Sequence, residues 1–443
     1  MRLGIDLGRA TCVATLLDRD GRLAAHAVVD STAGTAESVR RVLAELGPLA
    51  SGAESVALVT DLARRPHAVR RVALVRIASG SHPALAPLAD WPAPARTAVD
   101  ALTAVVAGGG TVTGGPAAPL DRSAVAAFAR QARAADVSAF AVCAAGAPTH
   151  PGPELEAAAV LADVVPGAAI SLSHEIGSAG LRERENATAV NAALGDWAAH
   201  LATEAARALR SAGLTAPLFF ARDDGGLVSA EYFRCYPVIA TVPTTACAAR
   251  GAAAAAGAGR ALVVDAGARA VRCLAVVDGE PERAVRPGPG PLAVPVHLGS
   301  PDIHEYDSRQ AEPEDLARFV ARQRERAADT ELVYTGGGAE LIGAPGAGAD
   351  LRTRCLTDAA RFAASSICRV DHEQFVVVAG RAEFEQRLAA VRDHALSRVV
   401  AAGAAPDTAH IESISHAPVA YLPAGVHRVT VRAAGRPAAG VPA

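Results

Sequence analysis

Residues 3–8 read LGIDLG, a short apolar strand that ends in Asp6 and Gly8. A second apolar strand follows at residues 14–18, and the Asp-Gly pair at 20–21 favours a tight turn after it. The stretch therefore predicts a β-hairpin at the start of the sequence, with an Asp-x-Gly sequence at its bend.

The same unit returns in the second half of the chain. Residues 262–267 read LVVDAG, an apolar strand follows at 273–277, and an Asp-Gly turn comes at 278–279. A glycine turn, TGGG at 335–338, comes after a further strand at 332–334. Two such hairpins in repeat order with a late glycine turn resemble the superfamily of actin, sugar kinases and heat-shock ATPases. The resemblance implies an α/β fold with two lobes, in which a ribonuclease H-like unit is duplicated.

Strands and helices alternate along the rest of the chain, which predicts a layered α/β architecture. The longest helical pattern covers residues 185–213, and Gly195 is expected to break it. Further helices are predicted at 35–46, 122–135, 154–163, 246–257, 315–328, 356–369 and 381–402, and further strands at 55–60, 137–143, 168–173, 218–221, 408–414 and 426–432.

Three segments are expected from this order of elements. Residues 1–180 form an N-terminal lobe, and residues 181–380 form a second lobe with a shortened insertion near 284–330. Residues 381–443 add a C-terminal helix and strands.

The composition excludes several classes of function. The 443 residues carry a net charge of -3 with 20% charged side chains, so neither nucleic acid nor a membrane surface is an expected partner. The chain has no lysine, which excludes a Walker lysine, a Schiff-base lysine and a lysine general base. Its 7 cysteines stand singly and no apolar run is long enough to span a bilayer, so we expect a cytoplasmic protein with reduced thiols.

A block in the middle of the chain carries a more specific signal. Residues 171–177 read SLSHEIG, residues 180–188 read GLRERENAT, and residues 191–194 read NAAL. The match continues through DDGGL at 223–227 to the tail, where residues 418–423 read PVAYLP. This sequence closely resembles the hydantoinase/oxoprolinase family along nearly the whole chain.

The resemblance implies ATP-dependent opening of an amide or lactam ring, or the related carboxylation of a ketone, often together with a second subunit. It implies ATP and Mg²⁺ as cofactors, with Asp6 and Asp265 holding the metal ion. The nucleotide-binding set implied in this way is Asp6, Gly8, Thr11, Asp265, Gly267, Gly336 and Gly337.

The two bends depart from the family pattern where phosphate should bind. Arg9 and Ala268 stand where a second glycine is expected, and Arg272 stands where an acid is expected. A Cβ atom is disfavoured at a position that needs a positive φ. Losing several charge-assisted phosphate contacts, each worth roughly 1.5–3 kcal/mol, removes much of the affinity for a nucleotide. The sequence therefore does not predict ordinary ATP use.

The middle block also supplies the candidate catalytic residues. His174 is a candidate general base or metal ligand, and Glu175 stands beside it. The alternative for His174 is a structural, hydrogen-bonded histidine. Asp224 follows a strand at the expected edge of the cleft, where it would position a substrate.

Three arginines and one asparagine form a candidate anion-binding set. Arg9, Arg269 and Arg272 would bind a carboxylate or phosphate if they face the cleft, and the alternative is surface drift in an arginine-rich sequence. Asn186 belongs to a charged helix start. Its side chain has either a structural role there or a place in the cleft.

Two functions remain open at this point. The first is a divergent hydrolase that opens a small cyclic amide, lactam or ureide by chemistry that need not use ATP. The second is a non-catalytic ligand-binding or scaffolding subunit of a heteromeric complex. The expected partners are a small amide-like molecule and either a second subunit or a second copy of the chain.

Overall fold

The computed structural model describes residues 1–31, 34–61, 69–79, 85–115, 118–177, 179–267, 269–284, 288–289, 291–307, 313–339 and 349–439. Ala268, one of the altered bend positions, lies outside them. The strands are β1 (Arg2–Leu7), β2 (Thr11–Leu17), β3 (Leu23–Asp30), β4 (Ser55–Val59), β5 (Ala73–Ile77), β6 (Leu102–Val106), β7 (Ala139–Ala144), β8 (Ala169–Leu172), β9 (Leu218–Ala221), β10 (Leu227–Ser229), β11 (Arg260–Ala266), β12 (Ala270–Val277), β13 (Glu280–Pro281), β14 (Gly288–Pro289), β15 (Pro295–Val296), β16 (His304–Asp307), β17 (Glu331–Thr335), β18 (Cys368–Val377), β19 (His410–Pro418) and β20 (Val426–Gly435). The α-helices are α1 (Thr35–Leu46), α2 (Ala93–Val99), α3 (Arg122–Ala134), α4 (Gly152–Val164), α5 (Ser173–Ile176), α6 (Leu181–Ser211), α7 (Ala230–Cys235), α8 (Pro243–Ala256), α9 (Pro313–Arg326), α10 (Ala349–Ser365) and α11 (Arg381–Ala401).

The expected repeat is present as two sheets with the same local topology. β1 pairs antiparallel with β2 and parallel with β4, and β3 pairs antiparallel with β2. In the second half β11 pairs antiparallel with β12 and parallel with β17, and β13 pairs antiparallel with β12. Asp6 stands near the end of β1 and Asp265 near the end of β11. The fold is a mixed α/β fold, as the alternation of elements predicts.

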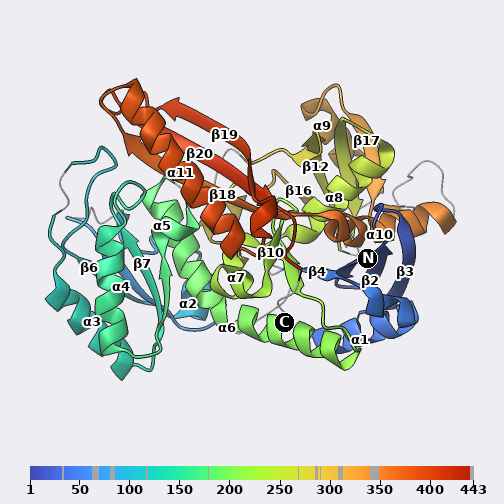
Figure 1. Cartoon of the computed structure of the whole chain (residues 1–443), viewed down its shortest axis with the longest axis horizontal. Helices are drawn as coiled ribbons and strands as arrows, with labels where there is room; N and C mark the ends of the chain where they lie inside the picture. The colour runs from blue at the N-terminus through green and yellow to red at the C-terminus, as the bar shows by residue number, and fades with distance from the viewer. Residues whose placement is uncertain are drawn as a thin grey trace.

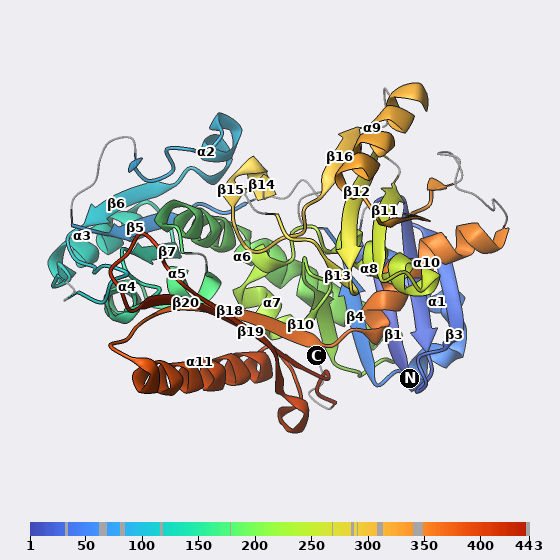
Figure 2. The ribbon, with the colours of Figure 1, turned by 90° about the horizontal axis from the view of Figure 1, so that it is seen from above.

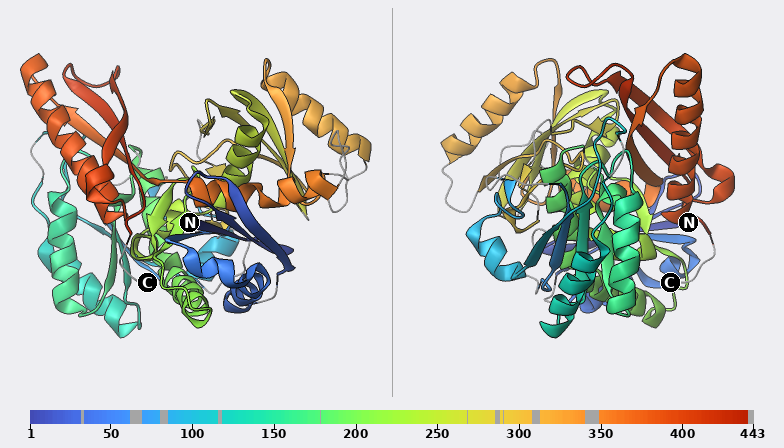
Figure 3. Two further views of the ribbon diagram at one scale, coloured as in Figure 1. Left: turned by 45° about the vertical axis from the view of Figure 1, so that its right-hand side comes forward. Right: turned by 90° about the vertical axis from the view of Figure 1, so that its left-hand side faces the viewer.

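The first sheet extends well beyond the repeat. Its order is β19-β20-β18-β10-β9-β4-β1-β2-β3, so strands from both ends of the chain belong to one sheet (Figure 1). The segment boundaries expected after residues 180 and 380 therefore both separate strands of the same sheet. Figure 3 shows the β19, β20 and α11 layer on one side of the molecule and the second sheet with α9 on the other.

Strand β18 differs from the sequence-based expectation, because the helix predicted at 356–369 runs past its start. The helix α10 ends at Ser365, and the first six of the ten residues of β18, which begins at Cys368, alternate between buried and half-buried positions. The charged residues that obscure this alternation are paired across the sheet. Asp371 stands opposite Arg432 of β20, with Nε of the arginine 2.8 Å from the carboxylate. A strand with so many charges is stable here because its partner strand carries the opposite charges.

A separate four-stranded sheet has the order β6-β5-β7-β8, and all of its pairs are parallel. Its core includes Phe140 and Leu161 and receives apolar side chains from α3 and α4. β5 and β6 are absent from the sequence-based expectations. This small sheet carries α4 and α5, which supply Glu154 and His174 to the candidate site.

The expected break at Gly195 is wrong, since α6 is one continuous helix of 31 residues. Gly195 instead lets the side chain of Arg70 lie directly on the helix backbone, where a Cβ atom would overlap the guanidinium group. Arg70 donates to the carbonyl of Ala192 at 2.7 Å and pairs with Asp196 at 2.7 Å. The glycine allows an arginine side chain to approach the helix backbone closely. A sequence pattern cannot distinguish this role of a glycine from a helix break.

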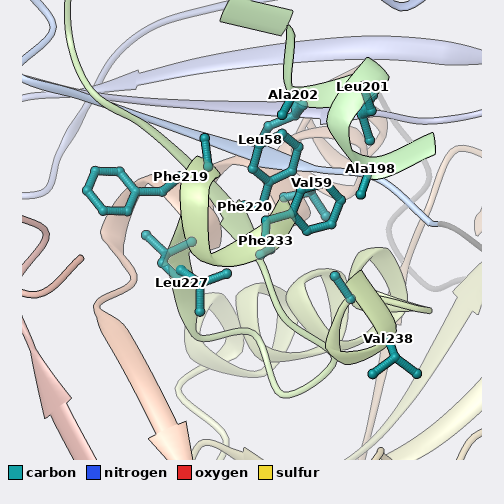
Figure 4. Close-up of a cluster of buried hydrophobic side chains, with 14 of the residues drawn as sticks. Leu58, Val59, Ala198, Leu201, Ala202, Phe219, Phe220, Leu227, Phe233 and Val238 are labelled. Atoms are coloured by element: carbon teal, nitrogen blue, oxygen red, sulfur yellow. The ribbon is translucent and has the colours of Figure 1, made fainter. Parts of the chain in front are cut away.

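The main core lies between α6, α7 and the centre of the first sheet. Phe220 of β9 stacks on Phe233 of α7 with ring centroids 4.1 Å apart, and Trp197 of α6 meets Phe233 edge-on at 6.3 Å. Figure 4 shows aromatic side chains of this core among Leu58, Leu201 and other aliphatic residues. Burial of such rings is the dominant stabilising term for this part of the fold.

Helices α8 and α10 lie between the two repeat sheets (Figure 2). Gly4 of β1 faces the backbone of Ala360 in α10 so closely that a Cβ atom could not be accommodated. Gly251 of α8 meets the backbone of Asp358 in the same way. The two helices and β1 therefore pack backbone against backbone. No helix in the described part of the chain is both long and apolar enough to cross a membrane.

Candidate functional site

Helices α4 and α5 bring a carboxylate and an imidazole together. Glu154 in the first turn of α4 is fully buried, and one of its oxygens lies 2.7 Å from Nδ1 of His174. The same oxygen accepts the backbone N–H of His174 at 3.1 Å. The other oxygen accepts the backbone N–H of Ala144 at 2.7 Å and the hydroxyl of Ser173. Four donors therefore hold this carboxylate in one position.

The contact with Glu154 determines how His174 can act. A carboxylate accepts the proton of Nδ1, so the lone pair of the neutral ring is on Nε2. The side chain of His174 is 19% exposed and lines a cavity. The pair therefore has the arrangement of a base that is oriented by a buried acid.

Arg184 of α6 completes the buried side of this arrangement. Its Nε donates to the hydroxyl of Ser173 at 2.8 Å, and its Nη2 donates to the carbonyl of Ala144 at 2.8 Å. Only 1% of the residue is exposed. The guanidinium compensates the charge of Glu154 through Ser173, and the group as a whole is satisfied although it is buried.

The cavity beside His174, here the outer cavity, has a volume of about 660 Å³. Its walls come from α5 and the start of α6, from residues 283–284 and 297–299, and from β18, β19, β20 and α11. Among the lining side chains are His174, Glu183, Arg283, Arg398, Glu373 and Arg428. The mixture of both charges suits a small polar ligand better than an apolar one.

A smaller inner pocket of about 70 Å³ adjoins the outer cavity and shares Ile176, Leu298, Gly299, Asp371 and Arg398 with it. Glu175 lines this pocket, and one of its oxygens accepts the hydroxyl of Tyr236 at 3.0 Å. Asp224 lines it as well. The three candidate catalytic residues from the sequence therefore lie around two adjoining spaces.

Asp224 is held by its own loop and by arginines. Its Oδ1 accepts the N–H of Gly226 at 2.9 Å and lies 3.5 Å from Nε of Arg222. Burial opposes ionisation, but Arg222, the Gly226 N–H, Arg369 and Arg250 together outweigh that effect and lower the pKa of Asp224. The carboxylate is therefore a fixed negative charge in the pocket wall.

The N-terminal end of α8 is occupied by carboxylates of the chain itself. The N–H of Val242 donates to Asp223 at 2.7 Å, and the N–H of Thr244 donates to Asp61 at 3.0 Å. The hydroxyl of Thr241 adds a bond of 2.6 Å to Asp223. Burial raises the pKa of Asp223 to about 7 although these donors oppose the rise, and the charge of Asp61 adds to it.

The two bends keep the tight geometry that their glycines predict. A Cβ atom at Gly8 would lie 2.7 Å from the carbonyl oxygen of Thr11, and Gly267 donates its N–H to the carbonyl of Ala270 at 3.0 Å. Gly336 has a φ of 85°, and a Cβ atom there would lie 2.6 Å from the carboxylate of Asp265. The structure therefore brings the late glycine turn, which Gly337 continues, against the second hairpin.

The three candidate arginines at the bends differ in their surroundings. Arg9 and Arg269 are exposed. Arg272 is buried, stands opposite Asp265 in the β-ladder, and has its Nε 2.6 Å from the carboxylate of Glu305. Its charge is therefore engaged in an ion pair within the second sheet.

Phosphates of a nucleotide do not fit the end of α8. N–H groups at a helix start attract anions, but two carboxylates already accept them here. Burial raises the pKa of the Cys247 thiol inside α8, and the charges of Asp6, Asp224 and Asp61 add to the rise. An incoming phosphate would be repelled by these negative charges.

The metal set implied by the resemblance consists of two residues in separate sheets, Asp6 in the first and Asp265 in the second. Within the described ranges, no group of three or more histidine, cysteine, aspartate or glutamate side chains converges as metal ligands. The two carboxylates remain predictions as metal ligands, and the geometry adds no third group to them.

Asn186 is fully buried and serves the packing of α6. Its side chain accepts Nε1–H of Trp91 at 2.8 Å and donates to the carbonyl of Pro295 at 2.9 Å. The lining of the two cavities does not include it. The helix itself begins after Gly180 without a side-chain cap, and Glu185 forms a buried ion pair with Arg76. This helix start is therefore charged and buried, and Glu185 pairs with an arginine of β5 in the four-stranded sheet.

Several residues of the site are not identified by the sequence. Glu154 has a usable signal, since positions 154, 157 and 161 form one face of α4 and the other two are apolar. A lone acid on an apolar helix face is a candidate for a buried functional group. Arg398 and Asp371 have no such signal, because α11 and β18 meet α5 only in the folded chain.

The chain resembles solved structures along nearly its whole length. An acetone carboxylase, solved without nucleotide in work on ATP-dependent acetone carboxylation, matches with a TM-score of 0.63 and 11% identity over 98% of this chain and 87% of that one. An ATP-dependent caprolactamase from Pseudomonas jessenii matches with a TM-score of 0.68 and 14% identity over 100% of this chain and 89% of that one. At these identities the likeness shows a shared mixed α/β fold. No family model and no curated protein matches the sequence.

Proposed function

We propose that the chain hydrolyses a small cyclic amide, lactam or ureide in the outer cavity and does so without a nucleotide. The observation that carries the proposal is the buried Glu154, 2.7 Å from Nδ1 of His174, which leaves Nε2 as the basic nitrogen of a histidine that lines the cavity. The fold shared with a caprolactamase supports the choice of a lactam-like substrate.

The proposed reaction adds one water across the ring C–N bond. Nε2 of His174 takes a proton from water while the water oxygen bonds to the amide carbonyl carbon, and the carbonyl oxygen becomes negative. The C–N bond then breaks, and the ring nitrogen receives the proton from His174. The product is an open chain with an amine, or a urea group in the ureide case, and a carboxylic acid. Glu154 keeps the imidazole in the required tautomer and stabilises its charged form.

Independence from a nucleotide is supported by the end of α8. Asp61 and Asp223 accept the N–H groups that would otherwise face a phosphate, and the charge of Arg272 is taken up by its ion pair with Glu305. The same observation favours a second candidate, a subunit that binds an amide-like ligand without turning it over. The two candidates share the cavity and differ in turnover.

The test uses the full chain with ε-caprolactam, 2-pyrrolidinone and hydantoin, each with and without MgATP. Mass spectrometry detects ring opening as the gain of one water. We expect turnover of at least one compound, equal with and without MgATP, and a fall of roughly 10²–10⁴-fold in kcat for His174→Gln. His200→Gln, an exposed position on α6, is the matched control. Saturable binding without turnover would identify the second candidate, and turnover only with MgATP would refute nucleotide independence.

A further inference from the structure

Arg398 differs from the other arginines that line the two cavities. Arg283 lies 3.1 Å from the carboxylate of Asp371, and Arg428 pairs with Glu373. Arg222 lies 3.5 Å from both Asp224 and Asp371. Each of these charges is therefore compensated within the wall.

Arg398 is held by uncharged acceptors instead. Its Nη2 donates to the backbone carbonyl of Glu175 at 2.7 Å and to the hydroxyl oxygen of Tyr232 at 3.1 Å, and its Nη1 lies 3.3 Å from Nδ1 of His372. Across the described ranges, no carboxylate forms an ion pair with it. A guanidinium group has five N–H donors, so these contacts fix its position and leave donors for a ligand.

His372 does not compensate the positive charge of Arg398. Burial lowers the pKa of His372 to about 3, and the neighbouring charges of Arg398 and His394 contribute. The neutral ring accepts from Arg398 at Nδ1, so its proton is on Nε2, 3.4 Å from the side-chain oxygen of Gln374. The imidazole therefore orients the guanidinium and leaves its full positive charge in place.

The location of this charge is specific. Arg398 lines both the inner pocket and the outer cavity. Its bond to the carbonyl of Glu175 places it next to the residue that follows His174 in α5. The carboxylates of Glu175, Asp224 and Asp371 also line the inner pocket, so the outer cavity beside His174 is the space where Arg398 can meet an anion. A cation held by uncharged acceptors in a partly buried wall attracts an anionic oxygen more strongly than the same group in water.

We propose that Arg398 is an oxyanion-binding residue, which holds a negatively charged oxygen of the ligand beside His174. The oxygen comes either from a carboxylate of the ligand or from the amide carbonyl after attack by water. Only the second source rests on the proposed hydrolysis, and the anion site itself does not.

The first experiment measures anion binding and needs no turnover. Benzoate is titrated into the full chain by calorimetry, and we expect Arg398→Gln to weaken its binding at least roughly 10-fold, the scale of one charge-assisted contact. Arg392→Gln, an exposed position on the same helix, should bind as the wild type does. Arg398→Lys keeps the charge and should lose less, which separates the loss of charge from misfolding. Equal binding by the wild type and Arg398→Gln, or no saturable binding by the wild type, would overturn the proposal.

The second experiment identifies the source of the oxygen. If the carbonyl oxygen is held, Arg398→Gln lowers kcat by roughly 100-fold and leaves KM unchanged. If a ligand carboxylate is held, KM rises for lactams that carry a carboxylate and stays the same for lactams without one. Unchanged kcat and KM for both kinds of lactam would exclude both sources. If no cyclic amide is opened at all, the proposed hydrolysis fails while the benzoate result still decides the anion site.

Discussion

The surroundings of His174 and the bends of the two hairpins use charged residues in opposite ways. Beside His174, Glu154 and Arg184 are buried and satisfied, and they support a side chain that faces a cavity of about 660 Å³. At the hairpins and the start of α8, Arg272 and Asp223 are bound to other parts of the chain. The charges beside His174 orient a side chain that faces a cavity. The charges at the hairpins and at the start of α8 occupy positions where a bound phosphate would otherwise make contacts. Among the described residues, the outer cavity, where the hydrolysis is proposed, has no lining residue from β1, β2, β11, β12 or α8.

The largest effect is expected at the support of His174. Glu154→Gln replaces one carboxylate oxygen, which accepts two of the four hydrogen bonds, and it removes the negative charge that Arg184 faces through Ser173. We expect a loss of about 3 kcal/mol in unfolding free energy, measured by urea denaturation, and a fall in turnover of roughly 100-fold. Glu156→Gln on the exposed face of the same helix is the control. Normal activity in Glu154→Gln would show that His174 needs no orientation.

The carboxylate at the start of α8 should give a pH-dependent stability. The folded state raises the pKa of Asp223 from 3.8 to about 7, so between these values it holds a proton that the unfolded state has lost. Its contribution is therefore present at low pH and is lost as the pH rises toward 7, with a slope of at most about 1.4 kcal/mol per pH unit. Asp223→Asn should remove this slope in denaturation curves taken between these pH values, whereas Asp407→Asn at an exposed position should retain it. Identical pH profiles for the wild type and Asp223→Asn would contradict this assignment.

A smaller effect is expected at the glycine turn. Gly336→Ala places a Cβ atom 2.5 Å from the carbonyl oxygen of Ala266 at a φ of 85°. We expect a loss of about 1–3 kcal/mol in unfolding free energy with ligand binding in the outer cavity unchanged. Gly257→Ala is the control that measures the cost of the backbone conformation alone, because its φ is 67° and no atom lies within 4 Å of the added Cβ. Loss of ligand binding in the outer cavity of Gly336→Ala would show that the glycine turn and the outer cavity are coupled.

The smallest effect is expected at the exposed arginine of the second bend. Arg269→Gln should change the unfolding free energy by no more than about 0.5 kcal/mol and leave turnover unchanged. Thermal unfolding and the lactam assay measure both. A clear fall in activity would show that the bends still take part in binding the ligand.

The elements of the repeat can be predicted from the sequence because their signals are local. Apolar strands that end in Asp-x-Gly indicate the two hairpins, and the apolar spacing predicts α1 with its observed bounds, Thr35–Leu46. Strand β18 escapes prediction because its charges are neutralised by β20, which comes much later in the chain. The break expected at Gly195 is wrong because the glycine accommodates Arg70, which comes from a distant segment. Local patterns determine the elements, and long-range pairing of charges decides the exceptions.

The candidate site likewise contains residues that local sequence patterns predict and residues that only the folded chain brings together. The sequence predicts His174, Glu175 and Asp224 as candidates, and in the structure they line the two adjoining spaces. It cannot identify Arg398, because the lack of a carboxylate partner among the described residues is a property of the folded neighbourhood. It also cannot show that Asp61 and Asp223 fill the start of α8, since they are far apart in the chain and a single helix end brings them together.

The continuous helix α6 has one more consequence, for spectroscopy. With a rise of about 1.5 Å per residue it spans roughly 46 Å, from the wall of the outer cavity to the far side of the main core. The chain has 2 tryptophans, and both report on this helix: Trp91 is bonded to Asn186 near its start, and Trp197 stands in its middle against Phe233. Intrinsic tryptophan fluorescence therefore samples α6 at two points, so a ligand that shifts the helix start would change the emission of an unlabelled protein.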